Sequence, residues 1–323
     1  MIKGQQAKKD KHVVVIGGGT GTFMVLTALR DYPIKLSSIV SMADNGGSTG
    51  RLRDQYGVLP PGDIRRSLVA LSDASQTLRD LFNYRFSGGD LKEHNFGNIF
   101  LSALEKITGG FDKAVKEASR ILNIRGSVIP VTLDNVNLCA ELTNGIVIKG
   151  ETNIDIPKHN PEIPIARAWL SPEAKINPEA RKTILSADMI VIGPGDLYTS
   201  IVPNLLVRGV VAALKSSKAK KVYICNLMTK FGETHGFKAH DFVSVVEKYL
   251  GKRVLDYAVF NSKKPSARVI RSYLEENSHF VDVSGLDAEK KQPKYILADL
   301  LDSGQFVRHN PRKKLAKILI SLL

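Results

Sequence analysis

The segment VVVIGGGTGTFMVLTALR, residues 13–30, constrains the fold of this chain more than any other part of its sequence. An apolar run leads into a glycine-rich turn, and an apolar-periodic segment typical of a helix follows. A strand that passes through glycines into a helix aims the helix's free N–H groups and positive end at one spot, which suits a phosphate. We predict that this turn binds a phosphate through Gly17, Gly18, Gly19, Thr20, Gly21 and Thr22.

Short β-branched runs alternate with segments of helical periodicity along the rest of the chain. The predicted strands are 13–16, 38–42, 128–132, 189–192, 222–226 and 256–260. The predicted helices are 20–29, 64–71, 100–107, 113–122, 205–214 and 242–250. This alternation indicates an α/β fold, a Rossmann-like three-layer sandwich in which helices cover both faces of a mostly parallel sheet.

We expect residues 12–323 to form one Rossmann-like α/β domain, preceded by a flexible basic arm at residues 1–11. The stretch Gly145–Ile156 departs from the alternation, because two alternating runs flank the tetrapeptide at 149–152 and predict a β-hairpin. The proline-rich residues 157–164 predict an extended connector. We interpret residues from about 143 to 165 as a β-hairpin insertion into this domain. Asn310 and Pro311 predict the start of a basic helix that runs to Leu323.

A second loop, ADNGGSTGRLRDQYG at residues 43–57, follows the second predicted strand. Its glycines and hydroxyls form a second anion-binding nest, and its two arginines can fork onto phosphate oxygens. Asp44 can bind a ribose hydroxyl, orient a nucleophile or hold Mg²⁺. The candidate ligand residues in this loop are Asp44, Asn45, Gly46, Gly47, Ser48, Thr49, Arg51 and Arg53.

Further glycine and small polar residues follow the other predicted strands. The carboxyl ends of parallel strands meet at one edge of a sheet, so these residues predict a nucleotide crevice at a topological switch point. Asp63 is either a helix cap or a ligand residue. The candidates in this group are Asp63, Asn98, Gly193, Pro194, Gly195, Tyr198, Thr199, Ser200 and Asn226.

The first glycine loop does not match the common phosphate motifs in full. It lacks the lysine of a Walker loop. Gly17 and Gly19 fit the dinucleotide fingerprint, and Asp44 stands where its acidic residue is expected, but Thr22 occupies the third glycine position. A nicotinamide enzyme therefore remains an alternative. The second anion loop argues against it, because an NAD enzyme rarely follows its acidic residue with such a loop.

The net charge of +14 raises the question of a nucleic-acid partner. The basic residues are spread along the chain without interleaved aromatics, so we expect a small anionic ligand and no nucleic acid. Cys139 and Cys225 are too far apart for a zinc motif and predict buried reduced thiols. The sequence has no apolar run of membrane-spanning length and no signal peptide, so we expect a cytoplasmic protein with no membrane span.

Taken together, the strings GGGTG, DNGGSTGRLR, PPGDIR, GNIF, GPGDLYTS, CNLMT and RHNP resemble the gluconeogenesis factor family. That family is related to the CofD-like 2-phospho-L-lactate transferases of coenzyme F420 synthesis. The resemblance spans roughly residues 12–320. Four positions depart from the family's usual strings, namely Arg66, Asp196, Phe231 and Asn310.

The resemblance implies a Rossmann-like fold and two alternative functions. In the transferase branch, the glycine loops hold a guanosine nucleotide, and the residue matching Asp44 lies near the acceptor and a metal. In the gluconeogenesis factor branch, the implied ligand is UDP-N-acetylglucosamine, without established catalysis. Tyr273 and Arg308 match its implied ligand contacts. The implied role is regulation of carbon flow toward cell-wall precursors and cell shape, with an enzyme of amino-sugar synthesis as a partner, and we expect a homo-oligomer.

Overall fold

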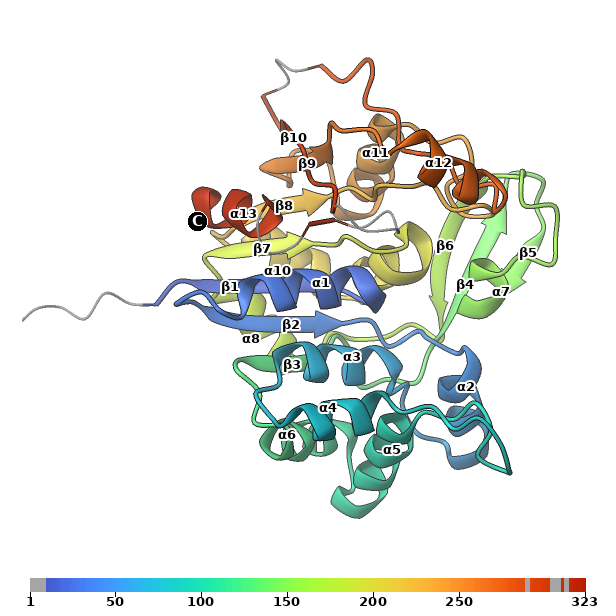
Figure 1. The fold of residues 1–323 in the computed structure, drawn as a ribbon, viewed down its shortest axis with the longest axis vertical. Coiled ribbons are helices and arrows are strands. Elements are labelled where there is room, and N and C mark those ends of the chain that lie inside the picture. Colours follow the sequence, from blue (N-terminus) through green and yellow to red (C-terminus); the bar gives the residue numbers. More distant parts are fainter. Residues whose placement is uncertain (1–9, 288–290, 303–308, 311–313) are drawn as a thin grey trace, which may run out of the picture.

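The computed structural model describes residues 10–287, 291–302, 309–310 and 314–323. Within them, a seven-stranded sheet has the order β10-β9-β8-β7-β1-β2-β3, and all neighbouring strands are parallel (Figure 1). Its strands are β1 (His12–Gly17), β2 (Lys35–Val40), β3 (Ser127–Pro130), β7 (Met189–Ile192), β8 (Lys220–Ile224), β9 (Tyr257–Asn261) and β10 (Lys294–Ala298).

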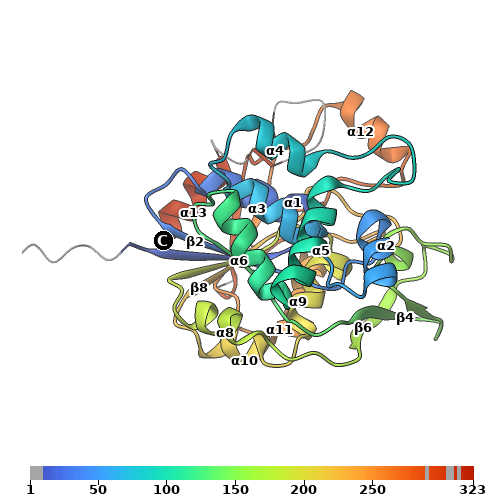
Figure 2. The same ribbon diagram turned by 90° about the horizontal axis from the view of Figure 1, so that it is seen from below.

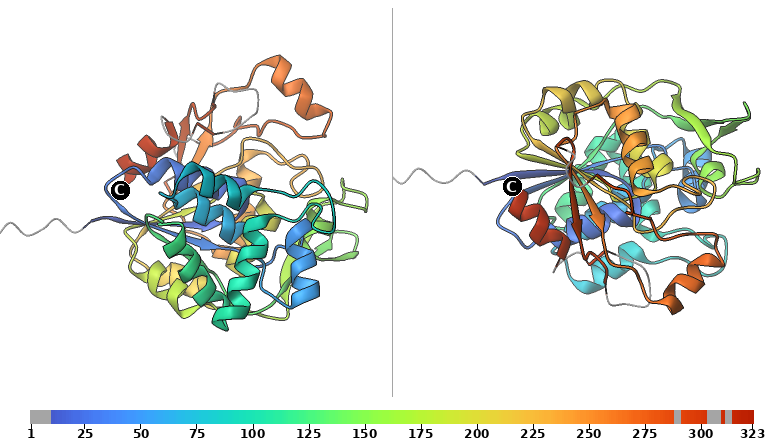
Figure 3. Two further views of the ribbon diagram at one scale, coloured as in Figure 1. Left: turned by 60° about the horizontal axis from the view of Figure 1, so that its bottom comes forward. Right: turned by 90° about the horizontal axis from the view of Figure 1, so that it is seen from above.

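Helices cover both faces of this sheet. In Figure 2, α1 (Gly19–Leu29), α3 (Gly62–Leu71), α4 (Gln76–Asn83) and α13 (Ala316–Leu322) lie on one side of the strands. On the other side lie α8 (Pro178–Leu185), α10 (Val210–Ser216) and α11 (Ala239–Leu250). Figure 3 shows from two further directions that helices lie on both faces of the sheet. The central strands β1 and β7 are buried along their whole length, which explains their continuous apolar sequence.

This arrangement confirms the predicted Rossmann-like α/β class with a mostly parallel sheet. The remaining helices are α2 (Gly47–Tyr56), α5 (Phe96–Thr108), α6 (Phe111–Ile121), α7 (Glu151–Asp155), the π-helical turn η1 (Leu197–Ile201), α9 (Val202–Leu206) and α12 (Ala267–Leu274). The single helix predicted at 205–214 is wrong, because α9 ends before Gly209 adopts a φ of +102° and α10 begins after it. Cys139 and Cys225 are buried free thiols, as predicted.

A small antiparallel sheet lies beside the carboxyl ends of the long sheet (Figure 1). It consists of β4 (Asn137–Leu142), β5 (Val147–Lys149) and β6 (Ile165–Ser171), in the order β5-β4-β6. The predicted hairpin turn at 149–152 is wrong. The turn between β4 and β5 lies earlier, at Gly145 with a φ of +85°, and residues 151–155 form α7. Asn45 starts that helix, because its Oδ1 accepts from the N–H and the hydroxyl of Thr152 at 2.9 and 3.0 Å.

The strand order contains one reversal. From β1 the chain adds β2 and β3 on one side, and it then returns to place β7 on the other side of β1. The helix α1 after β1 and the helix α10 after β7 lie on opposite faces of the sheet. In such sheets the crevice between these two strands is where ligands bind. Of the predicted terminal helix, residues 311–313 lie outside the described residues, as do residues 1–9 of the predicted arm.

Candidate functional site

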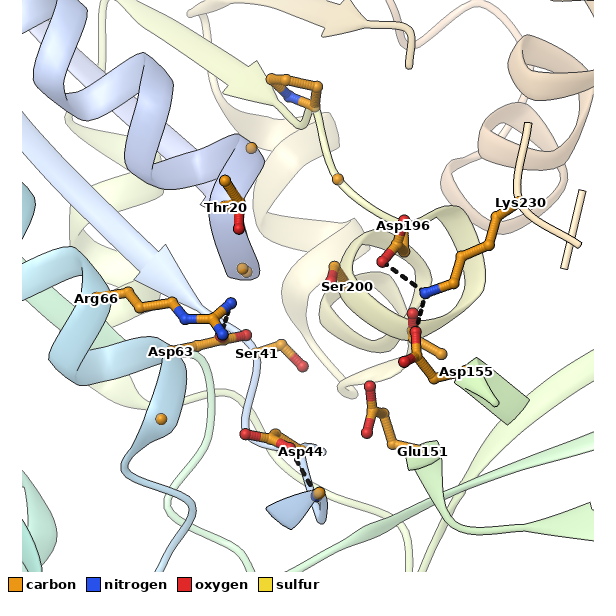
Figure 4. A pocket seen from close by; sticks show the side chains of 18 of the residues that line it. Thr20, Ser41, Asp44, Asp63, Arg66, Glu151, Asp155, Asp196, Ser200 and Lys230 are labelled. Carbon is orange, nitrogen blue, oxygen red and sulfur yellow. Dashed lines mark hydrogen bonds and ion pairs between the residues drawn. The ribbon is translucent and has the colours of Figure 1, made fainter. Parts of the chain in front are cut away.

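A cavity of about 690 Å³ opens at the carboxyl ends of β1, β2, β7 and β8 (Figure 4). The first and second glycine loops and the residues that follow β7 and β8 therefore meet in one place. The predicted ligand residues that line this cavity are Gly18, Gly19, Thr20, Gly21, Asp44, Gly46, Gly47, Ser48, Thr49, Asp63, Asn98, Pro194, Gly195, Thr199, Ser200, Asn226 and Tyr273.

The turn before α1 needs glycines because other backbone segments approach it closely. A Cβ on Gly21 would collide with the carbonyl oxygen of Pro194, in the turn that follows β7. Gly19 has a φ of +64°, a conformation that favours glycine. The N–H of Gly195 donates to Oδ1 of Asn226 at 3.1 Å, which joins this turn to the end of β8. The turns after β1, β7 and β8 are thus fixed against one another.

Three helices begin at the cavity wall. The N-terminal residues of α1, α2 and α3 all line it, and none of the N-cap residues of these helices makes a side-chain capping hydrogen bond. Their first N–H groups and positive dipole ends therefore favour an anion there. Asp63 lies in the first turn of α3 without capping it, and its carboxylate instead faces the Gly18–Gly19 turn of α1.

Arg51 and Arg53 have other partners than the cavity. Both lie on α2, where residues two apart point in different directions, and each has protein partners in the structure. Arg53 is buried, and it donates to the carbonyl oxygens of Asp44 at 2.7 Å and Val136 at 2.8 Å. Arg51 donates to the carbonyl oxygen of Lys92 at 3.1 Å. The second loop is thus shorter than expected, because α2 already begins at Gly47.

Several other predicted residues do not line the cavity and pack against other parts of the fold. Gly17 and Thr22 pack against each other at the start of α1. Tyr198 is buried and donates its hydroxyl to the carbonyl oxygen of Ile165 at 3.4 Å. The predicted residues that do not line the cavity are Gly17, Thr22, Asn45, Arg51, Arg53, Gly193 and Tyr198. Arg308 lies outside the described residues.

One side of the cavity carries a cation held by carboxylates. Nζ of Lys230 forms ion pairs with Asp155 and, at 3.0 Å, with Asp196 (Figure 4). It also forms an ion pair with Glu233 at 3.7 Å. Burial opposes the charge of Lys230, but these three carboxylates together raise its pKa above the usual value. Buried Glu233 also accepts from the N–H of Tyr198 and the hydroxyl of Thr199, each at 2.9 Å. Among the described residues, the Asp196 carboxylate thus pairs with Lys230, whereas Arg51 pairs with Glu93.

Two carboxyl groups in the cavity have a pKa above the usual value. Burial and the Asp44 carboxylate raise the pKa of Asp63 to about 6, although Arg66, Arg65 and a hydrogen bond from Gly19 oppose the shift. Burial, followed by the charges of Asp44, Asp155 and Asp63, raises the pKa of Glu151 to about 8. Glu151 is therefore mostly neutral at pH 7 and can donate a hydrogen bond as well as accept one.

Sequence reasoning missed several residues that line the cavity. Glu151 and Asp155 were assigned to a hairpin, although a glycine followed by an acidic residue is also typical of a helix start. Arg66 follows Asp63 at helical spacing and could have been found from that spacing. No signal in the sequence places Lys230 between three carboxylates. The missed lining residues include Arg65, Arg66, Arg85, Glu151, Asp155, Asp196 and Lys230.

Asp44, Asp63 and Glu151 place three carboxyl groups in one part of the cavity. Oδ1 of Asp44 accepts the N–H of Gly46 at 2.8 Å, and its other oxygen faces Gly62. The Asp44 charge raises the pKa of both Asp63 and Glu151, which shows that the charged forms of these carboxyl groups repel one another. A hard cation with oxygen ligands would relieve this repulsion. The second acidic group, Asp155, Asp196 and Glu233, already contains the ammonium of Lys230.

The sequence profile described as 2-phospho-L-lactate transferase CofD matches residues 13–301. The chain belongs to the CofD family. Within this family it is similar to proteins named gluconeogenesis factor. That of Bacillus subtilis is 40% identical over 96% of this chain and 98% of its own, and that of Halalkalibacterium halodurans is 40% identical over 96% of both chains. The resemblance to the gluconeogenesis factor family is confirmed.

A solved structure matches nearly the whole chain. A UPF0052 family member from Bacillus halodurans has a TM-score of 0.92 at 37% identity, covering 97% of this chain and 100% of its own. A relative from Aquifex aeolicus is 45% identical over 98% of this chain and 97% of its own length. Among the described residues, none of the helices combines the length and apolarity needed to cross a bilayer.

Proposed function

We propose that the protein binds a nucleoside-diphosphate sugar, UDP-N-acetylglucosamine, in this cavity. The observation that carries the proposal is the convergence of the N-termini of α1, α2 and α3 on one cavity at the switch point. Uncapped helix N-termini favour phosphate oxygens. A volume of about 690 Å³ lies in the range of ligand-binding pockets. The glycines leave room for the diphosphate to approach the backbone.

We further propose that binding is regulatory and links gluconeogenic carbon flow to cell-wall precursor synthesis and cell shape. The name of the relatives, gluconeogenesis factor, supports the metabolic part of this proposal. An enzyme of amino-sugar synthesis is the partner that such regulation requires. Titration calorimetry with UDP-N-acetylglucosamine, GDP and NAD tests the ligand. We expect the UDP-sugar to bind most tightly of the three. Binding of GDP or NAD without binding of the UDP-sugar would show that the proposed ligand is wrong.

Thr20→Asp tests whether the diphosphate lies at the start of α1. Thr20 is exposed in the first turn of that helix, where no acidic residue stands. A carboxylate there stabilises the helix by about 0.3–1 kcal/mol but repels a phosphate. We therefore expect an unchanged or higher Tm together with at least tenfold weaker UDP-sugar binding. Thr20→Asn, which adds no charge, is the matched control. Equal binding by both variants would place the diphosphate elsewhere.

Phosphotransfer from a nucleotide-activated donor is a second candidate function. It is favoured by the group of Asp44, Asp63 and Glu151 beside the helix N-termini, together with the name of the matching family, 2-phospho-L-lactate transferase. Asp44 and Asp63 would hold Mg²⁺, which supplies charge stabilisation at the transferred phosphoryl group. Phosphorus NMR of UDP-N-acetylglucosamine with the protein and Mg²⁺ separates the two candidates. An intact nucleotide supports regulatory binding, and release of UMP, with the sugar phosphate passing to water as the available acceptor, supports transfer.

A further inference from the structure

Arg66 lies at the turn that the diphosphate is proposed to occupy. Its Nη1 lies 3.7 Å from the position that a Cβ on Gly19 would take, and Oγ of Ser200 lies at the same distance from that position. Figure 4 shows the Arg66 side chain reaching from α3 toward the start of α1, on the opposite side of the cavity from Lys230. A guanidinium, a hydroxyl and the first N–H groups of α1 therefore surround one small volume.

The guanidinium of Arg66 is available for a ligand. It forms an ion pair with Asp63 at 3.8 Å, longer than a hydrogen bond, and its side chain is 43% exposed. Among the described residues it makes no hydrogen bond. Arg65 differs, because it is buried and donates to Oδ1 of Asn98 at 3.0 Å and Oδ1 of Asn83 at 2.6 Å. The fork of Arg66 is thus free to meet two phosphate oxygens.

Positive charge is concentrated on this wall of the cavity. Arg65, Arg66 and Arg85 all line it. Burial, together with the charges of Arg66 and Arg85, lowers the pKa of Arg65 to about 10. Like charges held this close repel one another, and an anion bound between them would relieve that repulsion.

We infer that Arg66 is the arginine that binds the ligand's diphosphate, together with the Gly19 turn and the Ser200 hydroxyl, and that Asp63 competes with the phosphate for its guanidinium. This inference rests on the proposed binding of a nucleoside-diphosphate sugar. It assigns to Arg66 the role that the sequence suggested for Arg51 and Arg53. Binding transfers the guanidinium from a long ion pair with Asp63 to shorter hydrogen bonds with phosphate oxygens.

Arg66→Gln and Arg51→Gln form a matched pair for the test. Arg51 has a side-chain exposure of 39% and a single carboxylate, Glu93, at 3.8 Å, yet it lies outside the cavity lining. Calorimetry with inorganic pyrophosphate and with UDP-N-acetylglucosamine measures both variants. We expect Arg66→Gln to weaken binding of each probe about tenfold to a hundredfold. Arg51→Gln should bind like the wild type.

A second comparison removes the effect of leaving Asp63 unpaired. Asp63→Asn alone should bind pyrophosphate more tightly than the wild type, because the competing carboxylate is gone. Adding Arg66→Gln to Asp63→Asn should cancel that gain and weaken binding below the wild-type level. Equal affinity of Asp63→Asn with and without Arg66→Gln would overturn the inference. So would a larger loss in Arg51→Gln than in Arg66→Gln.

The two probes separate this inference from the proposed function. A wild-type protein that binds pyrophosphate but not UDP-N-acetylglucosamine contradicts the proposed ligand, while the comparison of Arg66 and Arg51 still decides the phosphate site. A wild-type protein that binds neither probe overturns both. Circular dichroism and the Tm of each variant confirm that a loss of binding is not a loss of fold.

Discussion

The raised pKa of Asp63 has a consequence for the proposed ligand binding. Its carboxylate faces the Gly18–Gly19 turn, and its charged neighbours are Asp44, Arg65 and Arg66. Burial and Asp44 raise its pKa from 3.8 to about 6. Its charge therefore appears as the pH rises from about 5 to 7. A negative charge at this position opposes a bound diphosphate.

We predict that wild-type affinity for UDP-N-acetylglucosamine falls about tenfold between pH 5 and pH 7. The ligand itself has no group that titrates in this range, so the change reports on the protein. Asp63→Asn should bind with nearly constant affinity over the same range. Calorimetry at several pH values checks this. A wild-type affinity that is flat with pH, or rises with it, contradicts the prediction.

The same shift determines how Asp63 affects stability. Between pH 3.8 and about 6 the folded chain holds a proton at Asp63 that the unfolded chain releases. The contribution of Asp63 to the free energy of unfolding therefore decreases as the pH rises through this range. Asp63→Asn should raise the free energy of unfolding at pH 7.5 and leave it nearly unchanged at about pH 2.5, where both states are protonated. Urea unfolding at the two pH values measures the difference.

At the scale of elements, Lys230 joins three segments at one side of the cavity. Asp155 ends α7, Asp196 precedes η1, and Glu233 is buried beneath η1. The ammonium of Lys230 lies among their carboxylates. Without that cation, the three carboxyl groups face one another. The resulting repulsion is the reason to expect that α7 and η1 depend on Lys230 for their arrangement.

We predict that Lys230→Met lowers the free energy of unfolding by about 1–3 kcal/mol at pH 7.5, allowing for the partial exposure of Lys230. The loss should shrink as the pH falls, because Glu233, whose pKa burial and Asp196 raise to about 8, takes up a proton and leaves less repulsion among the three carboxyl groups. Their oxygens lie within 4.8 Å of one another, so Ca²⁺ should partly restore stability in this variant. Lys230→Arg keeps the charge and is the control. An unchanged Tm in Lys230→Met would contradict the prediction.

The glycine loops could be predicted from the sequence because their position depends on connectivity. Strands that alternate with helices run parallel, so the loops after β1, β2, β7 and β8 meet at one edge. The arginines could not be assigned in this way. Whether Arg51 or Arg66 faces the cavity depends on where α2 begins and how α2 and α3 are rotated. The small sheet was also missed in part, because the contact between Asn45 and Thr152 that starts α7 is made across the fold.

At the scale of the whole molecule, the cavity lies where separate parts of the chain meet. Its walls come from α1, α2 and α3, from the turns after β7 and β8, from α7 beside the small sheet, and from α12, which carries Tyr273. A ligand bound there contacts residues from Gly18 to His309. It therefore stabilises the fold as a whole, in proportion to its concentration above its Kd.

We predict that UDP-N-acetylglucosamine at 100 times its Kd adds about 2.7 kcal/mol to the free energy of unfolding. For a chain of 323 residues this corresponds to a rise in Tm of about 4 °C. NAD at the same concentration should leave the Tm unchanged, because the fingerprint turn carries Thr22 in its third glycine position and a second anion loop follows. Thr20→Asp should lose the shift with the UDP-sugar. Differential scanning calorimetry over a range of ligand concentrations measures the rise in Tm. A rise with NAD but not with the UDP-sugar would reverse the proposed choice of ligand.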